Sequence, residues 1–510
     1  MRASGILLPV FSLPSRYGIG DFSGIAFRFL DFLADAGQRY WQILPLAPAG
    51  GWNSPYQPLS CCAGDPVYIS PEALVGQKLL TEEELTEAWH EISLQMEPDR
   101  INYELLLPFR KALLKKAHSR FRENRDYHAF CAGNAGWLDD YALFASLHFH
   151  FGGINWTDWP EALRHRDPDT VASWAETLRE EIRLEKWMQY EFQREWKALR
   201  DYAHTKKIEI IGDIPIYASY ESSDCWTHPE LFRLRKDLRP LRIAGCPPDD
   251  FAPEGQRWGN PLYNWREMER TGFAWWIERL RQNCALYDVI RLDHTRGFES
   301  YFSIPAEDDS AVNGRWVKGP GMKFFRAVEA ALGPCRFIAE DLGFITPAVR
   351  NLIRRTGLPG MKVLQFAFDG DPENEYLPEN CTENCVVYTG THDNNTTRGW
   401  YNELPEDAKR MVTHYLRTSR STGIDQSSAS RNAPIFSSFA ACRLLVTLAM
   451  ESKAELCIIP LQDYLALGSE ARINVPGTVG DNWEWRMRKG AFTPDHAAYI
   501  RRMVKASGRL

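Results

Sequence analysis

The sequence predicts an α/β protein whose core is a closed barrel of eight parallel strands, a (β/α)8 or TIM barrel, with large and mainly helical insertions between strands. Three observations lead to this prediction. Short apolar runs alternate with helical patterns along most of the chain, which is the order expected of a parallel sheet. Acidic or imidazole residues follow directly after several of these runs. The stretch after the second run is too long to be a simple crossover between strands.

The first predicted strand covers residues 5–13 and is followed by a glycine-rich turn at 16–22. Apolar residues at helical spacing then predict a helix over 25–36, and residues 40–46 predict the second strand. The apolar start of the chain imitates a signal peptide, but it is short, contains Pro9 and lacks a small-residue cleavage site. We therefore expect it to be a strand.

Residues 71–204 are predicted to form a helical insertion after the second strand, because this part of the chain is mostly helical in pattern and more highly charged. One amphipathic helix within it carries apolar residues at steps of three and four. We interpret this stripe as core rather than as a ligand site. It consists of Leu184, Trp187, Met188, Phe192, Trp196 and Leu199.

Six further apolar runs complete the predicted barrel. They lie at 208–211, 289–292, 337–339, 361–368, 385–388 and 456–461. Helical patterns such as 322–332 and 347–356 separate them, so the strands should be parallel. Near the end of the chain, residues 472–478 predict a last active-site loop and residues 482–486 predict a closing helix.

We expect residues 1–510 to form a single catalytic barrel body with two insertions, at 71–204 and, after the third strand, at 218–285. The second insertion contains the loop 244–263, which is rich in proline and glycine and also holds aromatic residues. Long loops of this kind are functional or else disordered, and the aromatic residues argue against disorder. The loop is therefore predicted to border the active site.

Composition indicates a soluble globular protein, with 44% apolar and 25% charged residues among 510. A net charge of −7 without a basic run argues against nucleic-acid and membrane partners, and it favours a neutral substrate. Eleven cysteines without regular spacing or zinc-ligand partners predict reduced thiols in a cytoplasm. No apolar stretch is long enough to span a bilayer. The composition gives no indication of the oligomeric state.

The fourth strand ends in a carboxylate flanked by basic residues, in the order Arg291-Leu292-Asp293-His294-Thr295-Arg296. Burying this much charge is costly. Two guanidiniums near Asp293 should hold its carboxylate ionised, which suits a nucleophile. An ion-pair network that closes the strand end is the alternative interpretation of this stretch alone.

The same arrangement recurs at other strand ends. The fifth strand leads into Glu340, the seventh into His392 and Asp393, and the third into Asp213. Side chains at the C-terminal ends of parallel strands face one rim of a closed barrel, and that rim is where such barrels do chemistry. These residues are therefore predicted to meet at one site.

Three of these acids, Asp293, Glu340 and Asp393, suit glycosyl transfer. The reaction needs an ionised carboxylate that attacks the anomeric carbon and a protonated carboxyl that donates to the leaving oxygen. His294 and His392 can hydrogen-bond sugar hydroxyls. A metal site is the main alternative, but a hard-cation site usually gathers its carboxylates on a short loop and no such spacing is seen. We expect neither a metal nor a cofactor.

A glycine-rich loop at 50–57 follows the second strand. Its residues Trp52, Tyr56 and Gln57 offer the stacking faces and hydrogen bonds that a polyhydroxylated ligand uses. Considered alone, this loop is better explained as a packed surface loop.

Short motifs occur in a fixed order along nearly the whole chain. They are GILL at 5–8, SPYQ at 54–57, GDIPIY at 212–217, PPD at 247–249, QRWGNP at 256–261, RLDH at 291–294, AEDLG at 339–343, GMKVLQF at 360–366, THDN at 391–394 and PLQD at 460–463. In this order they resemble the motifs of the 4-alpha-glucanotransferases, also called amylomaltases or disproportionating enzymes, of glycoside hydrolase family 77.

The resemblance implies a nucleophile at Asp293, a general acid/base at Glu340 and a transition-state stabiliser at Asp393. It also implies two sets of substrate-binding residues. Those that line the site of the cleaved sugar are Asp213, Arg291, His294 and His392, and those on motifs that border neighbouring sugar subsites are Ser54, Tyr56, Gln256, Trp258 and Asn474.

The activity implied by the resemblance is transfer of alpha-1,4-glucan segments from a donor to the 4-hydroxyl of an acceptor by a retaining double displacement. The expected partners are malto-oligosaccharides, starch- or glycogen-type alpha-1,4-glucans, and glucose as acceptor. An alpha-glucan hydrolase of the amylase type has the same acids and is the main alternative. A catalytically inactive carbohydrate-binding barrel is a second alternative.

Three positions depart from the family pattern. Pro9 stands where many members have His, and Thr295 stands where many have Phe. Asp250 stands where many members have Tyr on the loop that overhangs the bound glucan. The last departure affects how that loop contacts the acceptor, and it leaves the three acids unchanged.

Overall fold

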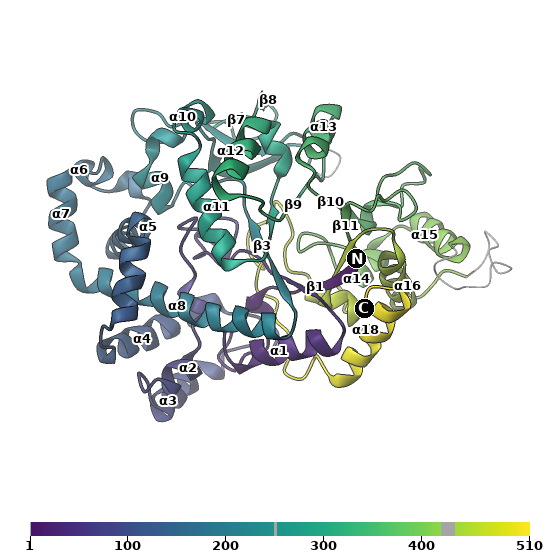
Figure 1. The fold of residues 1–510 in the computed structure, drawn as a ribbon, viewed down its shortest axis with the longest axis horizontal. Helices are drawn as coiled ribbons and strands as arrows, with labels where there is room; N and C mark the ends of the chain where they lie inside the picture. Colours follow the sequence, from purple (N-terminus) through teal and green to yellow (C-terminus); the bar gives the residue numbers. More distant parts are fainter. Residues whose placement is uncertain (1, 249–251, 420–433) are drawn as a thin grey trace.

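The computed structural model describes residues 2–248, 252–419 and 434–510, and it contains a closed barrel of parallel strands (Figure 1). The strands follow one another around the barrel in the order β1-β12-β11-β10-β9-β6-β3-β2. Their bounds are β1 Ala3–Leu7, β2 Tyr40–Gln42, β3 Glu209–Ile214, β6 Val289–Leu292, β9 Phe337–Ala339, β10 Gly360–Val363, β11 Cys385–Tyr388 and β12 Leu456–Pro460. The predicted fold class is confirmed.

The register of β3, β6 and β9 brings three strand ends side by side. Asp213 of β3 pairs with Arg291 of β6, and Leu292 of β6 pairs with Ala339 of β9. Because these strands are parallel, the residues that follow them leave the sheet at the same rim. Asp293 and Glu340, each the first residue after its strand, are therefore brought to one place by the sheet itself.

The interior of the barrel is packed with apolar side chains. One cluster of buried residues consists of Leu7, Ile211, Val289, Ile338, Met361, Val363, Val386, Tyr388 and Ile458. Side chains of this size fill the interior of an eight-stranded barrel, so the barrel is a solid core with its chemistry confined to the ends.

Helices surround the barrel and form most of the chain between β2 and β3, on the left of Figure 1. That stretch contains α2 Pro71–Gly76, α3 Glu82–Ser93, α4 Tyr103–Arg120, α5 Arg125–His150, α6 Glu161–Arg164, α7 Pro168–Thr177 and α8 Arg179–Thr205. The other helices are α1 Gly24–Asp35, α9 Ser223–Thr227, α10 Trp265–Arg270, α11 Ala274–Leu286, α12 Met322–Leu332, α13 Pro347–Thr356, α14 Thr397–Glu403, α15 Glu406–Thr418, α16 Ser438–Glu451, α17 Leu461–Tyr464 and α18 Pro494–Ala506. None of the helices in the described part of the chain combines the length and the apolarity that a membrane crossing requires.

Helix α8 is 27 residues long and contacts both α5 and α1. The whole stripe that the sequence predicted as core, from Leu184 to Leu199, is buried. Trp196 donates through its indole N–H to the carbonyl of Leu286, the last residue of α11, at 3.0 Å. The stripe therefore attaches the helical stretch to the barrel wall.

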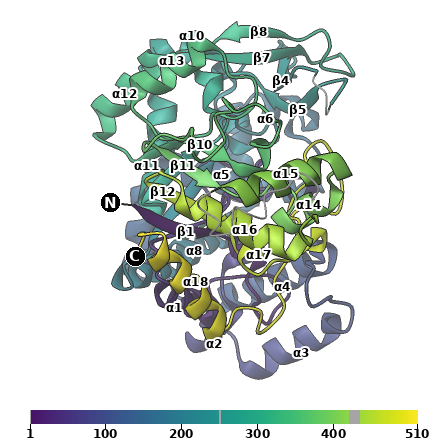
Figure 2. The same cartoon turned by 90° about the vertical axis from the view of Figure 1, so that its right-hand side faces the viewer.

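A second sheet, which the sequence analysis did not predict, lies beside the barrel at the top of Figures 1 and 2. It is antiparallel in the order β5-β4-β7-β8, with bounds β4 Arg242–Cys246, β5 Gln256–Pro261, β7 Ser300–Pro305 and β8 Arg315–Lys318. The end of β4 and the whole of β5 lie within the stretch 244–263 that we interpreted as a loop. A Cβ at Gly245 would lie 2.0 Å from the carbonyl oxygen of Gln256, so close strand contact requires this glycine.

Two predicted strands extended too far because each prediction included a proline, and the observed strand ends before it. β1 ends at Leu7, since Pro9 has no N–H for a ladder and a 3-10 turn follows it at Val10–Ser12. β2 ends at Gln42, before Pro45. β10 also ends early, because a 3-10 turn begins at Leu364.

The tail differs from its prediction as well. Residues 482–486 are not helical; the backbone N–H of Arg486 donates to the carbonyl of Asp99, and the carbonyl of Glu484 accepts from Ile101. This segment therefore bonds to the chain between α3 and α4. The closing helix is α18, which contacts α1 and α16.

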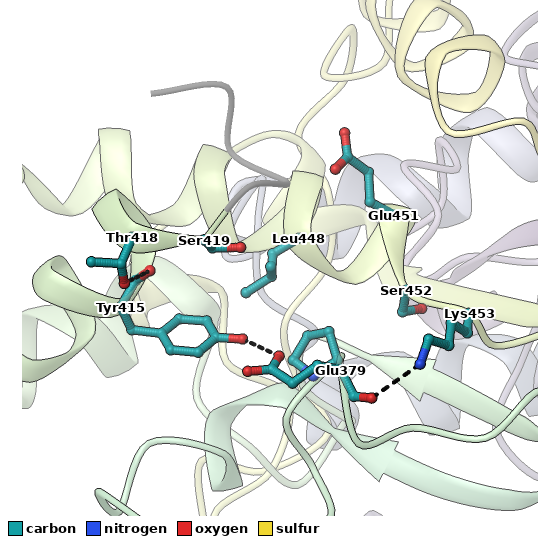
Figure 3. A pocket seen from close by; sticks show the side chains of 9 residues that line it. Glu379, Tyr415, Thr418, Ser419, Leu448, Glu451, Ser452 and Lys453 are labelled. Carbon is teal, nitrogen blue, oxygen red and sulfur yellow. Dashed lines mark hydrogen bonds between the residues drawn. The ribbon is translucent and has the colours of Figure 1, made fainter. Parts of the chain in front are cut away.

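A hollow of about 380 Å³ lies between the ends of α15 and α16 (Figure 3). The hydroxyl of Tyr415 donates to the carboxylate of Glu379, and the ammonium of Lys453 donates to the backbone carbonyl of Glu379. Glu379 and Lys453 precede β11 and β12, so this hollow is near the N-terminal ends of the barrel strands, away from the acids at their C-terminal ends.

The two ends of the chain lie close together in both views (Figures 1 and 2), and a buried arginine connects them. Arg509 donates to the carbonyls of Met450 and Ser452, at 2.7 and 3.0 Å. It also donates to the carbonyl of Ala3 in β1, at 2.9 Å. With 1% of its surface exposed, it satisfies backbone acceptors that water does not reach.

Replacing Arg509 by Ala should lower the free energy of unfolding by about 2–4 kcal/mol, because several buried carbonyls lose their donor. The measurement is the urea midpoint, with Arg502→Ala on the exposed face of α18 as the matched control. A midpoint for Arg509→Ala equal to that of the control would show that these hydrogen bonds contribute little.

Candidate active site

A buried arginine links two acids at the C-terminal rim of the barrel. Nη1 of Arg291 donates to both oxygens of Asp213, at 2.9 and 2.7 Å, and to Oδ1 of Asp293, at 3.0 Å. Arg291 and Asp213 are 3% and 1% exposed, whereas the side chain of Asp293 is 27% exposed. Asp213 is therefore the buried partner of the arginine, and Asp293 presents its carboxylate to a ligand.

Backbone amides hold the carboxylate of Glu340. The N–H of His294 donates to Oε2 at 2.6 Å, and the N–H of Leu342 donates to Oε1 at 2.9 Å. His294 adopts a left-handed conformation, with φ 47° and ψ 46°, which is uncommon for a residue other than glycine. The N–H of Thr295 donates to the backbone carbonyl of Glu340 at 3.0 Å. The turn after Asp293 thus orients the second acid.

The last loop of the chain holds Asp393. Nδ2 of Asn474 donates to Oδ1 of Asp393 at 2.6 Å, and Nη2 of Arg472 donates to its backbone carbonyl at 2.9 Å. Nε2 of His392 lies 3.4 Å from Oδ2. The side chain of Asp393 is 44% exposed, so it is positioned from one side and open to solvent on the other.

Burial raises the pKa of both Asp293 and Glu340. Burial, together with the carboxylates of Asp213, Glu340 and Asp393, raises the pKa of Asp293 to about 8, against the opposing effect of Arg291. Burial also raises the pKa of Glu340, opposed by Arg291 and by its two amide donors. Arg291 opposes the rise in the pKa of Asp293 without cancelling it, so the expectation that guanidiniums hold Asp293 ionised is not met. Because the two acids interact, they titrate together, and the form in which Asp293 is ionised is the one in which Glu340 carries the proton.

Arg296 does not join the acids, contrary to the expectation that two guanidiniums flank Asp293. Its guanidinium lies 3.7 Å from the centre of the Trp316 ring and donates to the backbone carbonyl of Phe344. The 3-10 turn Thr295–Phe298, which begins two residues after Asp293, directs it toward β8. Arg291 supplies the guanidinium beside Asp293.

The loop after β2 brings an aromatic ring to the acids. The hydroxyl of Tyr56 donates to Oδ2 of Asp213 at 2.7 Å, and the Tyr56 ring stacks on His392 with centroids 5.1 Å apart and planes 16° apart. The hydroxyl of Ser54 accepts the N–H of Tyr56 at 3.3 Å. Trp483 lies 5.7 Å from the Tyr56 ring. An aromatic face at this position suits the apolar face of a sugar.

A second aromatic contact lies beside Glu340. The rings of Trp258 and His294 meet edge to face, with centroids 4.9 Å apart. The indole N–H of Trp258 donates to the side-chain oxygen of Gln256 at 3.1 Å. The backbone carbonyl of Trp258 accepts from the side-chain amide of Gln57 at 3.0 Å. Burial lowers the pKa of His294 to about 3, so its imidazole is neutral. Nε2 of His294 is buried without a partner among the described residues, so it can exchange a hydrogen bond with a ligand hydroxyl.

These contacts bring the predicted site residues together at one rim, while their individual roles remain predictions. Arg472 and Trp483 were missed as site residues. Arg472 lies in the predicted last active-site loop, so its place in the sequence indicated that it is near the site. Trp483 was assigned to a closing helix, so its place in the sequence gave no such indication. The amide of Leu342 had no signal in the sequence, because any residue supplies a backbone N–H.

The structure describes two of the three positions that depart from the family pattern. The hydroxyl of Thr295 donates to the carbonyl of Leu292 at 2.7 Å, so this buried residue closes the turn that orients Glu340. Pro9 begins the 3-10 turn after β1. Asp250 lies outside the described residues.

Comparison with known proteins places this geometry in a family. A family model described as 4-alpha-glucanotransferase matches residues 8–492. The chain belongs to this family. It is 40% identical to the 4-alpha-glucanotransferase of Clostridium butyricum over 98% of this chain and 99% of the relative. It is 43% identical to that of Thermus thermophilus over 100% of this chain and 99% of the relative.

A solved structure agrees with the sequence relatives. The amylomaltase from Streptococcus agalactiae in complex with acarbose superimposes with a TM-score of 0.92 at 35% identity, covering 100% of both chains. The family that the ordered motifs predicted is therefore confirmed.

Replacing Asn474 by Ala should lower kcat on maltotriose about 10–100-fold and change KM little, because a hydrogen bond to the Asp393 carboxylate is lost. Asn482→Ala, in the same loop but bonded to Thr478 and Val475, is the matched control and should have a smaller effect. A raised KM with unchanged kcat would indicate that the Asn474 amide binds sugar instead.

Replacing Asp293 by Asn should abolish turnover and stabilise the fold at pH 7 by about 1–2 kcal/mol. An acid whose folded pKa is raised destabilises the folded state as pH rises from the unfolded value, near 4, to the folded value of about 8. The gain should therefore disappear near pH 4. Urea unfolding at both pH values measures it, with the exposed Asp309→Asn as control. An equal gain at both pH values would contradict this account.

Proposed function

We propose that this protein transfers alpha-1,4-glucan segments from a donor malto-oligosaccharide to the 4-hydroxyl of an acceptor glucan or glucose by a retaining double displacement. The observation that carries the proposal is the unequal treatment of two neighbouring acids. Asp293 lies against a guanidinium, which favours its ionised form, whereas burial raises the pKa of Glu340 although two backbone amides donate to its carboxylate. This difference suits one acid to attack while ionised and the other to donate a proton.

In the first step, an oxygen of the Asp293 carboxylate attacks the anomeric carbon of the donor. The glycosidic bond breaks, and Glu340 gives its proton to the departing glycosidic oxygen, which leaves as the 4-hydroxyl of the released chain. A glycosyl ester on Asp293 remains. Arg291 stays beside Asp213 throughout, so the guanidinium is not left unpaired when the Asp293 charge is consumed.

In the second step, the Glu340 carboxylate takes the proton of an acceptor 4-hydroxyl. The acceptor oxygen attacks the anomeric carbon, the ester to Asp293 breaks, and the configuration is retained after two inversions. We assign Asp393, whose carboxylate accepts from Asn474, to binding sugar hydroxyls and to stabilising the positive charge that develops at the transition state.

Transfer rather than hydrolysis requires that the acceptor be held in place. Water is always present at the rim, whereas a positioned hydroxyl reaches an effective molarity of about 10⁵ M or more. The rings and amides of Tyr56, Gln256 and Trp258 are suited to hold an acceptor, because they stack on sugar faces and hydrogen-bond hydroxyls. The related amylomaltase in complex with acarbose supports an alpha-glucan type of ligand.

We also propose that residues 1–510 act as one catalytic body with insertions at 71–204 and 218–285. The barrel strands support this division, since the first and last of them pair. None of the cysteines in the described part of the chain is joined in a disulfide, which supports a reducing compartment such as the cytoplasm.

Maltotriose supplied alone should yield glucose together with a ladder of chains longer than the substrate. The total of reducing ends should stay nearly constant, because each bond broken is replaced by another. Chromatography of the products and a reducing-end assay measure both quantities. Products that are only shorter than the substrate, with a steady rise of reducing ends, would identify a hydrolase.

The same assay, applied to the variant Trp258→Ala, tests whether this residue holds the acceptor. Lengthening should weaken more than donor cleavage, so reducing ends should now rise. Trp137→Ala on α5 is the matched control and should behave like the wild type. Equal losses of lengthening and cleavage in Trp258→Ala would remove this residue from acceptor binding.

A further inference from the structure

Two cysteines meet on the wall of the barrel, away from the acids. Cys284 lies in α11, and Cys335 lies between α12 and β9. The S–H of Cys284 points to the sulfur of Cys335 at 3.8 Å. Both residues are partly exposed, so small solutes can reach them. Cys381 and Cys385 also hydrogen-bond to each other, but both are buried.

The position of this pair is defined by the barrel strands. Cys284 lies just before β6, and Cys335 lies just before β9, and these strands are neighbours with Ile290 opposite Phe337. The pair is therefore near the N-terminal ends of the two strands whose C-terminal ends lead to Asp293 and Glu340. In barrels of this type the N-terminal face serves stability rather than chemistry.

We propose that Cys284 and Cys335 form a reversible thiol–disulfide site that reacts with a low-molecular-weight disulfide of the glutathione type. The Cys335 thiolate attacks one sulfur of the small disulfide, forming a mixed disulfide and releasing one small thiol. The Cys284 thiolate then attacks the Cys335 sulfur and releases the second small thiol. Two protein thiols are oxidised, one small disulfide is reduced, and both protons end on the released thiols.

The geometry favours closure of the crosslink. A disulfide bond measures about 2.05 Å, so the two sulfurs need to approach by less than about 2 Å, which side-chain rotation can supply. The Cys335 sulfur is the first nucleophile because it accepts the S–H of Cys284. Burial and the contact with Cys335 raise the pKa of Cys284 to about 12, so Cys284 keeps its proton while Cys335 attacks first. Arg200, which donates to the carbonyl of the neighbouring Ala285 at 2.8 Å, opposes this rise and favours the Cys284 thiolate in the second step.

The crosslink has a defined consequence. It closes a loop of about 50 residues that contains β6 and the small-sheet strands β7 and β8, and it should raise Tm by about 2–4 °C. The rate of glucan transfer should not change, because the crosslink lies at the opposite end of the strands from Asp293 and Glu340.

The test treats the full chain with oxidised glutathione, blocks free thiols and digests the protein without reduction. Mass spectrometry should find a peptide containing Cys284 joined to one containing Cys335. Dithiothreitol should release them and reverse the shift in Tm. Cys131→Ser, which removes another partly exposed thiol, is the matched control and should crosslink like the wild type.

Single variants of the pair test the order of steps. Cys284→Ser should stop at a mixed disulfide of glutathione on Cys335, whereas Cys335→Ser should carry little glutathione on Cys284. Unmodified thiols in the wild type, or glutathione on both cysteines without the joined peptides, would overturn the proposal. Serine differs from cysteine by one atom, and unchanged transfer activity in both variants checks that they fold.

Discussion

The contact of Arg291 with two aspartates is the interaction on which the rest of the site depends. Removing a guanidinium and a carboxylate from water costs several kcal/mol per ion, and close geometry is needed to offset this. The barrel supplies that geometry, because the register of β3 and β6 sets Asp213 opposite Arg291. Because the Asp213 carboxylate balances its charge, Arg291 holds Asp293 at a position that a ligand can reach. The hydroxyl of Tyr56 also donates to Asp213, so this one aspartate positions both the Tyr56 ring and Arg291.

Glu340 shows how the same fold prepares a similar group for a different task. Its carboxylate is oriented by backbone amides, one of which comes from the left-handed residue His294. A residue in that conformation costs about 1 kcal/mol or more and persists where its surroundings enforce it. The buried hydroxyl of Thr295 closes the same turn. Local strain after β6 therefore orients the acid that follows β9, and it links the two acids mechanically as well as electrostatically.

The barrel and its acids were predictable from the sequence because their signal is local. An apolar run that ends in an acid, as at 289–293, identifies both the strand and its functional end. The contacts that hold the acids are not local: Asn474 reaches Asp393 across 81 positions, and Tyr56 reaches Asp213 across 157. The small sheet was missed because its strands β4 and β5 contain glycine and proline, which are also the residues of irregular loops, and only the structure shows that Gly245 is there to let the two strands approach closely.

The central claim is that Asp293 becomes covalently attached to the sugar. A maltosyl fluoride supplied to the Glu340→Gln variant tests it most directly, because fluoride leaves without an acid whereas the second step lacks its base. Peptide mapping by mass spectrometry should then find a maltosyl ester on the peptide that contains Asp293. An ester on the peptide that contains Asp393, or release of fluoride without any labelled peptide, would contradict the account.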